Sequence, residues 1–448
     1  MKRLKNLFNS ETPANIEEDN TTDAELSGVN GDQLKNLPED FAVLELPEAL
    51  NLVVMKLGFA GCTPVQNEVL PHSLDGKDII AQAQTGTGKT AAFLISIITY
   101  HMENPEFESR QTGAPFALII APTRELVLQI TNDAKQLSEF TDLRVLAVVG
   151  GMDYEKQKKQ LKKHIDIVVA TPGRLLDFLQ SNIIDLSLVE TLVIDEADRM
   201  LSMGFIPDVK SIIRRTPRKE NRQTQLFSAT INEDIRRLAA SWTLDPVEIE
   251  IEPAKLAIDS VKQLVYLTSE DHKFNVLYNL INSPGVDRVL VFINRRDQTR
   301  EIESRLFQHG VDCGLLTGEV AQKKRIRTLD DFKEGKIKVL VATDVAGRGI
   351  HVEGITHVIN YNLPEDSEDY VHRIGRTGRA GASGISISLA CENDSFMLPS
   401  IESLLGESFT CEQPPLALLA KIPPPVRKAR ERRFQESRNR PGGRYRGR

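Results

Sequence analysis

The segment Ala83–Thr90, which reads AQTGTGKT, restricts the possible folds of this chain more than any other feature. It follows the apolar pair Ile79–Ile80 and precedes the apolar helical segment AAFLISII. A Gly-rich turn between a strand and a helix directs several backbone N–H groups and the positive end of the helix dipole at one point. The segment therefore predicts an α/β fold with a phosphate site, in which Lys89 reaches the outer phosphates and the Thr90 hydroxyl binds Mg²⁺.

An acidic pair follows a second apolar strand further along the chain. Asp195 and Glu196 open the tetrapeptide DEAD, directly after the apolar residues 192–194. Mg²⁺ prefers oxygen ligands, and an attacking water needs a carboxylate to orient it. We therefore expect Asp195 to hold Mg²⁺ through water and Glu196 to orient or deprotonate the attacking water. Together with the Gly-rich turn, the pair predicts a nucleoside triphosphatase.

The length of 448 residues and the apolar pattern predict two α/β domains. Short apolar strands alternate with longer amphipathic segments from about residue 76, which indicates parallel sheets covered by helices. The expected strands form two series, 116–121, 145–149, 165–170, 191–194 and 225–228, then 288–293, 338–343, 356–361 and 384–390. Between the series, the charged passage IEIEPAKLAIDS lacks helix periodicity and is predicted to be a linker. We expect domains at 41–250 and 263–410, joined by a linker at 251–262.

The two ends of the chain differ sharply in charge, which the net charge of −7 conceals. Six carboxylates and no Lys or Arg occupy residues 11–25, so we expect the acidic leader, residues 1–40, to be disordered. Residues 427–448 carry ten Lys or Arg against two Glu, within a Pro-, Arg- and Gly-rich tail at 411–448. Tyr445 lies between arginine and glycine residues, a mixture that suits stacking on unpaired bases and attraction to phosphates. A tail that only solubilises the chain is the alternative.

The remaining composition predicts neither a metal cluster nor a membrane protein. The four cysteines, Cys62, Cys313, Cys391 and Cys411, form no CxxC pair, so zinc and disulfides are not expected. No apolar signal region follows residues 1–8, and no stretch of eighteen apolar residues occurs, so we expect a cytoplasmic protein without a membrane partner.

Three further features have ordinary structural interpretations. Trp242 ends an apolar helix and is expected to pack in a core. The run KQKKQLKK at 156–163 is predicted to be a solvated helix face, and His164 and His357 lack partners at the spacing of metal ligands.

The order and spacing of the motifs resemble those of DEAD-box ATP-dependent RNA helicases, over residues 41 to about 405. In the first half, the similar segments are Phe41, GFAGCTPVQ at 58–66, PTREL at 122–126, Gly150–Gly151 and TPGR at 171–174. Ala83, at the place of the first glycine of the general phosphate turn, is also typical of helicases. The resemblance implies that adenine is hydrogen-bonded by Thr63 and Gln66, and that ATP is bound by Phe41, Thr63, Gln66, Ala83, Gln84, Thr85, Gly86, Thr87, Gly88, Lys89 and Thr90. It implies that RNA lies against Pro122, Thr123, Arg124, Gly150, Gly151, Thr171, Gly173 and Arg174.

The second half of the chain resembles the same family in VFINRR at 291–296, Gln322 with Arg325, ATDVAGRGI at 342–350 and HRIGRTGR at 372–379. These segments imply RNA contacts by Asn294, Arg295, Gln322, Arg325 and Thr343. The spacing of Arg376 and Arg379 lets two guanidinium groups converge on a γ-phosphate, as an arginine finger does. The hydroxyls of Ser228 and Thr230, in LFSAT, are expected to hydrogen-bond the Asp198 carboxylate. The residues expected to couple ATP to RNA are Asp198, Ser228, Thr230, Asp344, His372 and Arg373.

The resemblance implies a fold of two tandem RecA-like parallel-sheet domains, a P-loop NTPase of helicase superfamily 2. ATP and Mg²⁺ would lie at the domain interface, catalysis would involve Lys89, Asp195, Glu196, Arg376 and Arg379, and single-stranded RNA would cross both domains. The implied activity is local, poorly processive separation of RNA duplexes by a monomer. Two alternatives stay open, a DNA translocase of the same superfamily and an RNA-binding chaperone or scaffold with little turnover.

Some segments resemble one type within the family, the RNA degradosome helicase. They are Cys62 before TPVQ, LLTGEVAQKKR at 315–325, EDYVHRIGRTGRAGASG at 368–384 and SLACE at 388–392. This type shares His351, where most of the family has Asp in contact with the ribose. Gly347, where Ala is usual, is expected to add backbone freedom. The resemblance implies a role in RNA degradation, with an RNase E-like endoribonuclease and polynucleotide phosphorylase as partners.

Overall fold

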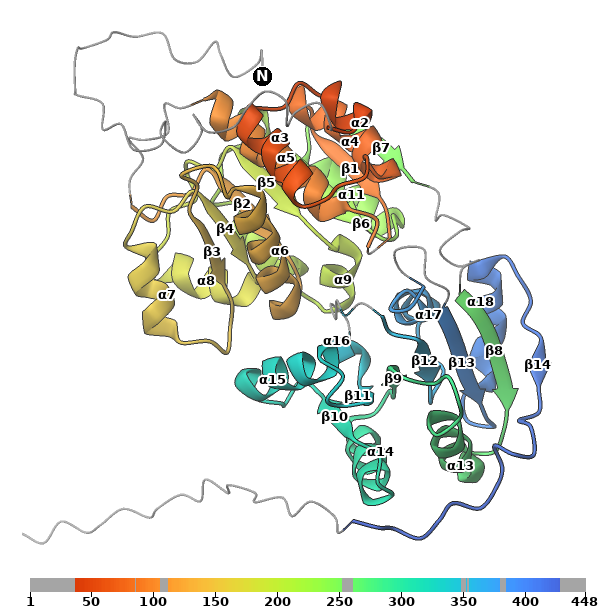
Figure 1. The fold of residues 1–448 in the computed structure, drawn as a ribbon. Coiled ribbons are helices and arrows are strands. Elements are labelled where there is room, and N and C mark those ends of the chain that lie inside the picture. The colour runs from red at the N-terminus through yellow and green to blue at the C-terminus, as the bar shows by residue number, and fades with distance from the viewer. Residues whose placement is uncertain are drawn as a thin grey trace, which may run out of the picture. The chain divides into compact units, whose positions relative to one another are not determined.

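The computed structural model describes residues 37–84, 86–104, 112–251, 261–347, 352, 354–378 and 384–427. These residues form two compact units, drawn in Figure 1 mainly in red to light green and mainly in green to blue. Described residues up to 262, with 352 and 374–378, belong to the first unit. The second unit contains the described residues of 263–347, 354–373 and 384–427.

The described part of the first unit contains a seven-stranded parallel sheet. Its spatial order is β3-β4-β2-β5-β6-β1-β7. The strands are β1 (Ile79–Gln82), β2 (Ala117–Ile120), β3 (Val145–Val148), β4 (Ile167–Ala170), β5 (Thr191–Ile194), β6 (Gln223–Ser228) and β7 (Val247–Glu250). β2, β4 and β5 are buried along their whole length, because helices cover both faces of a parallel sheet. This burial explains the uninterrupted apolar runs from which these strands were predicted.

Helices cover each face of this first sheet. One apolar core joins the sheet to α2 (Glu39–Ala42), α3 (Glu48–Lys56), α4 (Pro64–Leu74), α5 (Lys89–Glu103) and α6 (Arg124–Leu137). The other core joins it to α8 (Pro172–Gln180), α9 (Ala197–Ser202), α10 (Ile206–Ile213) and α11 (Glu233–Trp242). Neighbouring strand residues alternate between the cores: Ile79 and Ala81 enter the first, and Ile80 enters the second. Trp242 is buried in the second core, which confirms the packing role predicted for it.

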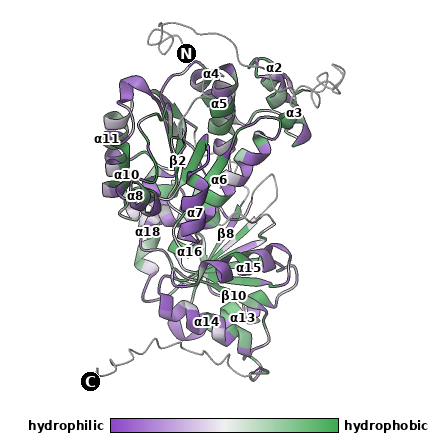
Figure 2. Ribbon diagram, turned by 90° about the vertical axis from the view of Figure 1, so that its left-hand side faces the viewer, coloured by the Kyte–Doolittle hydropathy of each residue, from purple (hydrophilic) through white to green (hydrophobic). Residues whose placement is uncertain are grey.

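The described part of the first unit also contains α7 (Tyr154–Leu161) and the 3-10 turn η3 (Lys219–Asn221). α7 contains most of the KQKKQLKK run and turns Gln157 and Leu161 inward while its lysines lie mainly toward solvent. In Figure 2 the ribbon of α7 has the colour of hydrophilic residues. The prediction of a solvated helix face at 156–163 is thus confirmed.

One strand of this sheet, β7, was not among the predicted strands. Ile249 and Glu250 open the charged passage that suggested a linker, but they lie in a strand that pairs with β1 and ends at the expected domain boundary of 250. β7 is an edge strand with Ile249 buried between the exposed Glu248 and Glu250. A strand that buries one face alternates apolar and charged residues, so its composition is close to that of a linker.

The described part of the second unit contains another seven-stranded sheet, in the order β10-β11-β9-β12-β13-β8-β14. Its strands are β8 (Val261–Leu267), β9 (Val289–Phe292), β10 (Cys313–Leu316), β11 (Val339–Ala342), β12 (His357–Asn360), β13 (Gly384–Ala390) and β14 (Cys411–Glu412). Its helical elements are α13 (Glu270–Ile281), α14 (Arg296–Gln308), α15 (Gln322–Lys333), α16 (Asp344–Gly347), α17 (Ser367–Ile374), the 3-10 turn η4 (Ser395–Met397) and α18 (Leu398–Leu405). The two parallel sheets with flanking helices confirm the predicted fold class of tandem RecA-like domains.

The expected linker and the expected tail each contribute residues to the second sheet. β8 begins at Val261, inside the expected linker, and β14 pairs with β8 although the tail was expected to begin at 411. Leu418 is buried in the core of this unit, and its carbonyl accepts a hydrogen bond from Asn279 Nδ2 at 2.9 Å. Ordered packing therefore continues past the predicted boundary at 410. Residues 1–36 of the expected leader and 428–448 of the basic tail lie outside the described residues.

Candidate functional site

The Gly-rich turn leaves the C-terminal end of β1 and enters α5. Gly86 and Gly88 have φ values of 88° and 95°, in the left-handed region that side chains disfavour. A Cβ at Gly88 would lie 2.6 Å from Gln66 Nε2 and 2.8 Å from Thr63 Oγ1. Gly88 is therefore required by its backbone conformation and by the close approach of α4.

Side chains of the turn bond back to its own backbone. Lys89 is buried, and its Nζ donates to the Ala83 carbonyl at 2.7 Å. The Thr87 hydroxyl donates to the Gln84 carbonyl at 2.8 Å. The amine of Lys89 therefore lies within the curl of the turn. Thr85 lies outside the described residues.

The expected adenine segment is bonded directly to this turn. The Thr63 N–H donates to Gln66 Oε1 at 2.9 Å, and the Gln66 N–H donates to Thr63 Oγ1 at 3.4 Å, which forms a capping box at the start of α4. Gln66 Nε2 also donates to the Gly88 carbonyl at 3.1 Å. Phe41 is fully buried, with its ring perpendicular to that of Phe59 at a centroid distance of 5.7 Å. The structure thus brings Thr63 and Gln66 to the phosphate turn and places Phe41 in the first core.

The acidic pair follows β5 directly and is almost completely buried. Glu196 has a φ of 55°, and its N–H donates to Asp195 Oδ1 at 3.0 Å. A non-glycine residue in the left-handed region stores strain, which is frequent at functional sites. Burial raises the pKa of Asp195 to about 6, and the charge of Lys89 acts in the opposite direction. Lys89 and Asp195 lie at the same edge of the sheet, because the turn follows β1, the acidic pair follows β5, and both strands pair with β6.

Arg199, in α9, is a site residue that was not predicted. Its Nη1 donates to Glu196 Oε2 at 2.8 Å, and both side chains are buried. Burial alone raises the pKa of Glu196, but the charges of Arg199 and Lys89 outweigh it and lower that pKa below its ordinary value. Glu196 is therefore held ionised and in one orientation. The spacing of three residues, which brings two helical side chains together, was the signal that could have identified Arg199.

Asp198 ties the acidic strand end to the loop after β6. Its Oδ2 accepts hydrogen bonds from the Ala229 N–H and the Thr230 N–H, both at 3.1 Å, and from the Thr230 hydroxyl at 3.4 Å. Ser228 differs from the prediction, because its Oγ accepts a bond from the backbone N–H of Asp198 at 3.2 Å. The predicted bond from the Thr230 hydroxyl to the carboxylate is thus present, and two backbone N–H groups of the loop take the place of the predicted bond from Ser228.

Two of the predicted RNA segments in the first unit meet at Arg124, the first residue of α6. A Cβ at Gly151 would lie 2.1 Å from Arg124 Nη1, and one at Gly150 would lie 3.4 Å from Nη2. The glycine pair therefore makes room for the guanidinium group. Thr123 caps α6 by accepting a hydrogen bond from the Leu126 N–H at 3.3 Å. Segments that follow β2 and β3 are thus joined at the carboxyl edge of the sheet.

The third RNA segment follows β4, which lies between β2 and β3 in the sheet. Arg174 lies over the rings of Tyr154 and Phe178, at 5.2 and 5.7 Å from their centroids. Its Nη1 also donates to the Met152 carbonyl at 3.4 Å. The aromatic rings therefore orient its guanidinium plane. The other predicted residues at this edge are Pro122 and Thr171, both buried, and the exposed Gly173.

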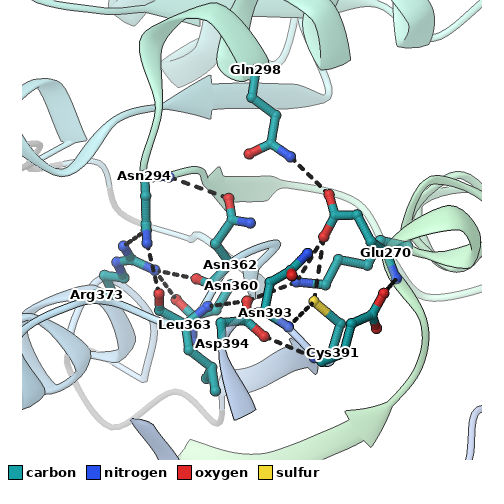
Figure 3. Close-up of polar contacts among 12 residues, drawn as sticks. Glu270, Asn294, Gln298, Asn360, Asn362, Leu363, Arg373, Cys391, Asn393 and Asp394 are labelled. Carbon is teal, nitrogen blue, oxygen red and sulfur yellow. Dashed lines mark hydrogen bonds and ion pairs between the residues drawn. The ribbon is translucent and has the colours of Figure 1, made fainter. Parts of the chain in front are cut away.

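In the second unit, Arg373 is the centre of a buried polar network (Figure 3). It forms a bidentate ion pair with Asp344, with both N–O distances 2.6 Å. Its Nη2 donates to Asn294 Oδ1 at 2.7 Å, and its Nη1 donates to the Asn362 carbonyl at 2.7 Å and to Asn360 Oδ1 at 3.3 Å. The guanidinium group thus holds together the ends of β9, β11 and β12.

The other predicted residues of the second unit differ in exposure. Arg325 is buried and donates from Nη2 to the Ala346 carbonyl at 2.6 Å, and Gln322 is buried beside it on α15. The Arg295 side chain is 75% exposed and pairs with Asp297 at 2.7 Å. Two more predicted residues are the buried Thr343 after β11 and, on α17, His372, whose Nδ1 is 3.7 Å from Asp369 Oδ1.

Gly347 has a packing role that differs from the predicted backbone freedom. A Cβ at this position would lie 2.4 Å from Cε1 of Phe292. The aromatic ring occupies the space that an alanine side chain would fill.

Of the two expected arginine-finger residues, only Arg376 lies in the described part of the chain, where it is buried after α17. Arg379 and His351 lie outside the described residues.

Thr90 and Asp195 offer the hydroxyl and carboxylate oxygens that Mg²⁺ prefers. Thr90 is half-buried in the first turn of α5, and the buried Asp195 carboxyl group has a raised pKa that a cation would lower. Within the described ranges, no group of three or more His, Cys, Asp or Glu could hold a metal ion. These two oxygen donors therefore fit a cation whose remaining ligands include phosphate oxygens. None of the helices that the structure describes combines the length and the apolar composition of a membrane span.

Comparisons with known proteins agree with this geometry. The family model described as DEAD/DEAH box helicase matches residues 63–238, and the helicase conserved C-terminal domain matches 272–381. The chain is 57% identical over 377 residues to the ATP-dependent RNA helicase RhlB of Pseudomonas syringae pv. tomato, which covers 84% of this chain and 95% of the relative. It is 57% identical over 384 residues to the RhlB of Pseudomonas aeruginosa, with 86% and 97% covered.

A solved structure shows the same architecture. Saccharomyces cerevisiae Dbp5 bound to RNA and ADP BeF3 is 30% identical, with a TM-score of 0.75 over 84% of this chain and 96% of the Dbp5 chain. The phosphate turn, the acidic strand end and these matches lead to one assignment: the chain belongs to the DEAD-box family of ATP-dependent RNA helicases.

Proposed function

We propose that this helicase separates short RNA duplexes locally, with ATP bound at the Gly-rich turn and hydrolysed beside the acidic pair. The observation that carries this proposal is that Lys89 and the pair Asp195–Glu196 lie at one edge of the sheet, because the Gly-rich turn follows β1, the acidic pair follows β5, and these two parallel strands flank β6. A phosphate-binding amine beside two buried carboxyl groups is the arrangement that phosphoryl transfer to water requires.

ATP would enter by replacing hydrogen bonds that the turn makes to itself. The phosphates would take the Lys89 amine from the Ala83 carbonyl, and the N–H groups at the start of α5 would add further donors. Thr63 and Gln66 would read the adenine, and the bond from Gln66 to Gly88 would relay its presence to the turn.

Thr90 and Asp195 would hold Mg²⁺, the hydroxyl directly and the carboxylate through water. When bound, the ion neutralises charge that develops on the transferred phosphoryl group. Glu196 would orient the attacking water, with Arg199 fixing its carboxylate.

Arg376 and Arg379 would stabilise the negative charge of the transition state, because planar guanidinium groups match phosphate oxygens. Communication with RNA would pass through Asp198, which holds the loop of Ser228 and Thr230. In the second unit, it would pass through Asp344, His372 and Arg373.

RNA would lie along the carboxyl edges of the two sheets, where the predicted RNA residues are found. Contacts to phosphates and 2′-hydroxyls would make binding tolerant of sequence, dependent on salt and selective for RNA over DNA. Bending of one strand would prevent it from remaining paired. The residues to which we assign RNA contacts are Pro122, Thr123, Arg124, Gly150, Gly151, Thr171, Gly173, Arg174, Asn294, Arg295, Gln322, Arg325 and Thr343.

The biological setting that we propose is RNA degradation in the cytoplasm. An RNase E-like endoribonuclease and polynucleotide phosphorylase are the proposed partners of a monomeric helicase. Support comes from the segments at 315–325 and 388–392, which resemble the degradosome type, and from the curated relatives named RhlB.

Replacement of Glu196 tests the catalytic assignment. Glu196→Gln should abolish ATP turnover while RNA binding in the presence of ATP persists, because only the group that orients the water is lost. Glu248→Gln, on the exposed edge of β7, is the matched control and should retain full activity. Unchanged ATPase in Glu196→Gln would refute the assignment.

The nucleic-acid assignment is tested with the unmodified chain. ATPase should be stimulated by RNA and not by DNA of the same sequence. Equal stimulation by DNA would favour the DNA translocase, and RNA binding without turnover would favour the chaperone or scaffold.

A further inference from the structure

Lys273 on α13 is completely buried although it belongs to none of the ATP or RNA motifs. Its Nζ donates to Asp394 Oδ2 at 2.7 Å and lies 3.7 Å from Glu270 Oε2. It also lies 5.7 Å from the centroid of the Tyr361 ring. A buried ion pair contributes little stability beyond that of a well-packed apolar pair, but it imposes directed hydrogen bonds.

A first chain of hydrogen bonds leads from Lys273 to the turn between β9 and α14, residues 293–295. Asp394 Oδ2 accepts a bond from the Leu363 N–H at 3.2 Å. The Leu363 carbonyl then accepts from Asn294 Nδ2 at 2.8 Å, and Asn294 Oδ1 accepts from Arg373 at 2.7 Å. The amide of Asn294 is therefore held on both sides by the protein, as Figure 3 shows.

A second chain reaches the other side of the same turn. Glu270 Oε1 accepts a hydrogen bond from Gln298 Nε2 at 3.0 Å, and Gln298 lies in the first turn of α14. Glu270 Oε2 accepts from the Cys391 thiol at 3.3 Å, so the carboxylate is fixed between α13 and the end of β13. In Figure 3, one chain leads from Glu270 to Gln298, and the other leads from Asp394 through Leu363 to Asn294.

We propose that Lys273, Asp394 and Glu270, the Lys273 clamp, are positioning residues that hold the turn at 293–295 in place for RNA. The inference rests on the proposed function, because it takes Arg295 as an RNA contact. Asn294 uses its side chain within the protein, whereas the Arg295 side chain projects into solvent from the next position. The clamp touches no RNA itself and acts by fixing the backbone from which Arg295 extends.

The test is an RNA titration of the ATPase with the intact chain. The double variant Lys273→Met, Asp394→Leu replaces the buried ion pair by two apolar side chains of similar size. It thereby removes the acceptor for the Leu363 N–H without leaving a buried charge unpaired at these two positions. The half-saturating RNA concentration should rise about threefold to tenfold, as expected for loss of one hydrogen-bonded support. ATPase without RNA should stay unchanged, because the clamp includes none of the residues that we assign to ATP binding or hydrolysis.

The matched control is Lys338→Met. Lys338 Nζ donates to the Ile281 carbonyl at 2.7 Å, and the residue lies at the opposite, amino end of β11. This variant should keep the wild-type half-saturating concentration even where its thermal stability falls. A purely structural clamp would behave like the control.

Two more variants make the outcome decisive. Gln298→Met breaks only the second chain on a half-buried helix face, so it provides a folded test if the double variant does not fold; it should raise the half-saturating concentration about twofold. Arg295→Ala should raise it as well, and its effect should be smaller in a clamp variant, because both changes act through one turn.

An unchanged half-saturating concentration in folded clamp variants, with wild-type ATPase that responds to RNA, would overturn the clamp. Full additivity with Arg295→Ala would overturn it too. Wild-type ATPase that does not respond to RNA would instead overturn the proposed function.

Discussion

Gly347→Ala tests whether packing, rather than backbone freedom, requires glycine at this position. The added Cβ would meet Phe292 at 2.4 Å from Cε1 and 3.1 Å from Cζ. Phe292 is buried, and the Arg373 guanidinium lies 5.2 Å from its ring centroid, so the ring has little room to retreat. The structure therefore predicts overpacking.

Two opposing effects determine the size of the change. An alanine in a helix is intrinsically preferred to glycine by about 1 kcal/mol. Overpacking of a well-packed core costs about 1–3 kcal/mol, and a contact as short as 2.4 Å belongs at the upper end of that range. We expect a net loss of about 2 kcal/mol, which lowers the unfolding midpoint of a unit of this size by about 4–8 °C.

Differential scanning calorimetry of the intact chain measures this midpoint. Gly318→Ala is the matched control, because nothing lies within 4 Å of a Cβ at that position in the same unit. Phe292→Leu combined with Gly347→Ala should recover part of the loss, since the smaller side chain vacates the contested space. A Gly347→Ala midpoint at or above that of the wild type, or an equal loss in the Phe292→Leu background, would refute the packing argument.

Three other predictions concern the remaining parts of the molecule. Arg199→Met should lower the kcat of RNA-stimulated ATPase about 10- to 100-fold without a matching change in RNA affinity, because Glu196 loses its fixed orientation; an unaltered kcat would contradict this role. Burial raises the pKa of Asp133 from 3.8 to about 6, because the folded protein favours the protonated carboxyl group. The stability that this preference contributes is fully present below pH 3.8 and is lost as the pH rises through about 6. Asp133→Asn should therefore raise the melting temperature at pH 7.5 by on the order of 2 °C, with no gain below pH 4, and a gain independent of pH would disprove the cause. Truncation after Arg427, whose guanidinium pairs with Asp312, should weaken RNA binding and flatten its dependence on salt while saturated ATPase persists; an unchanged salt slope would exclude the tail from RNA binding.

The sequence was most informative where function or burial depends on neighbouring residues. The Gly-rich turn and the DEAD strand end are contiguous segments, and the chemistry of phosphates and Mg²⁺ demands their residue types directly. Central strands such as β2 and β5 were recognisable because both of their faces are buried, which leaves uninterrupted apolar runs. β7 was missed because an edge strand with one buried face alternates charged and apolar residues.

Contacts between residues that are far apart in the sequence could not be predicted from local sequence patterns. Gly347 is required by Phe292, and Asp394 lies 121 residues from the lysine that it pairs with. Phe41 packs against Phe59 in the first core, and this contact depends on how the helices pack, which local sequence does not determine. A local motif specifies which chemical groups are available at one strand end, because backbone geometry acts over a few residues. Which side chains from separate strand ends meet is decided only by the folded sheet, because that depends on strand order and packing.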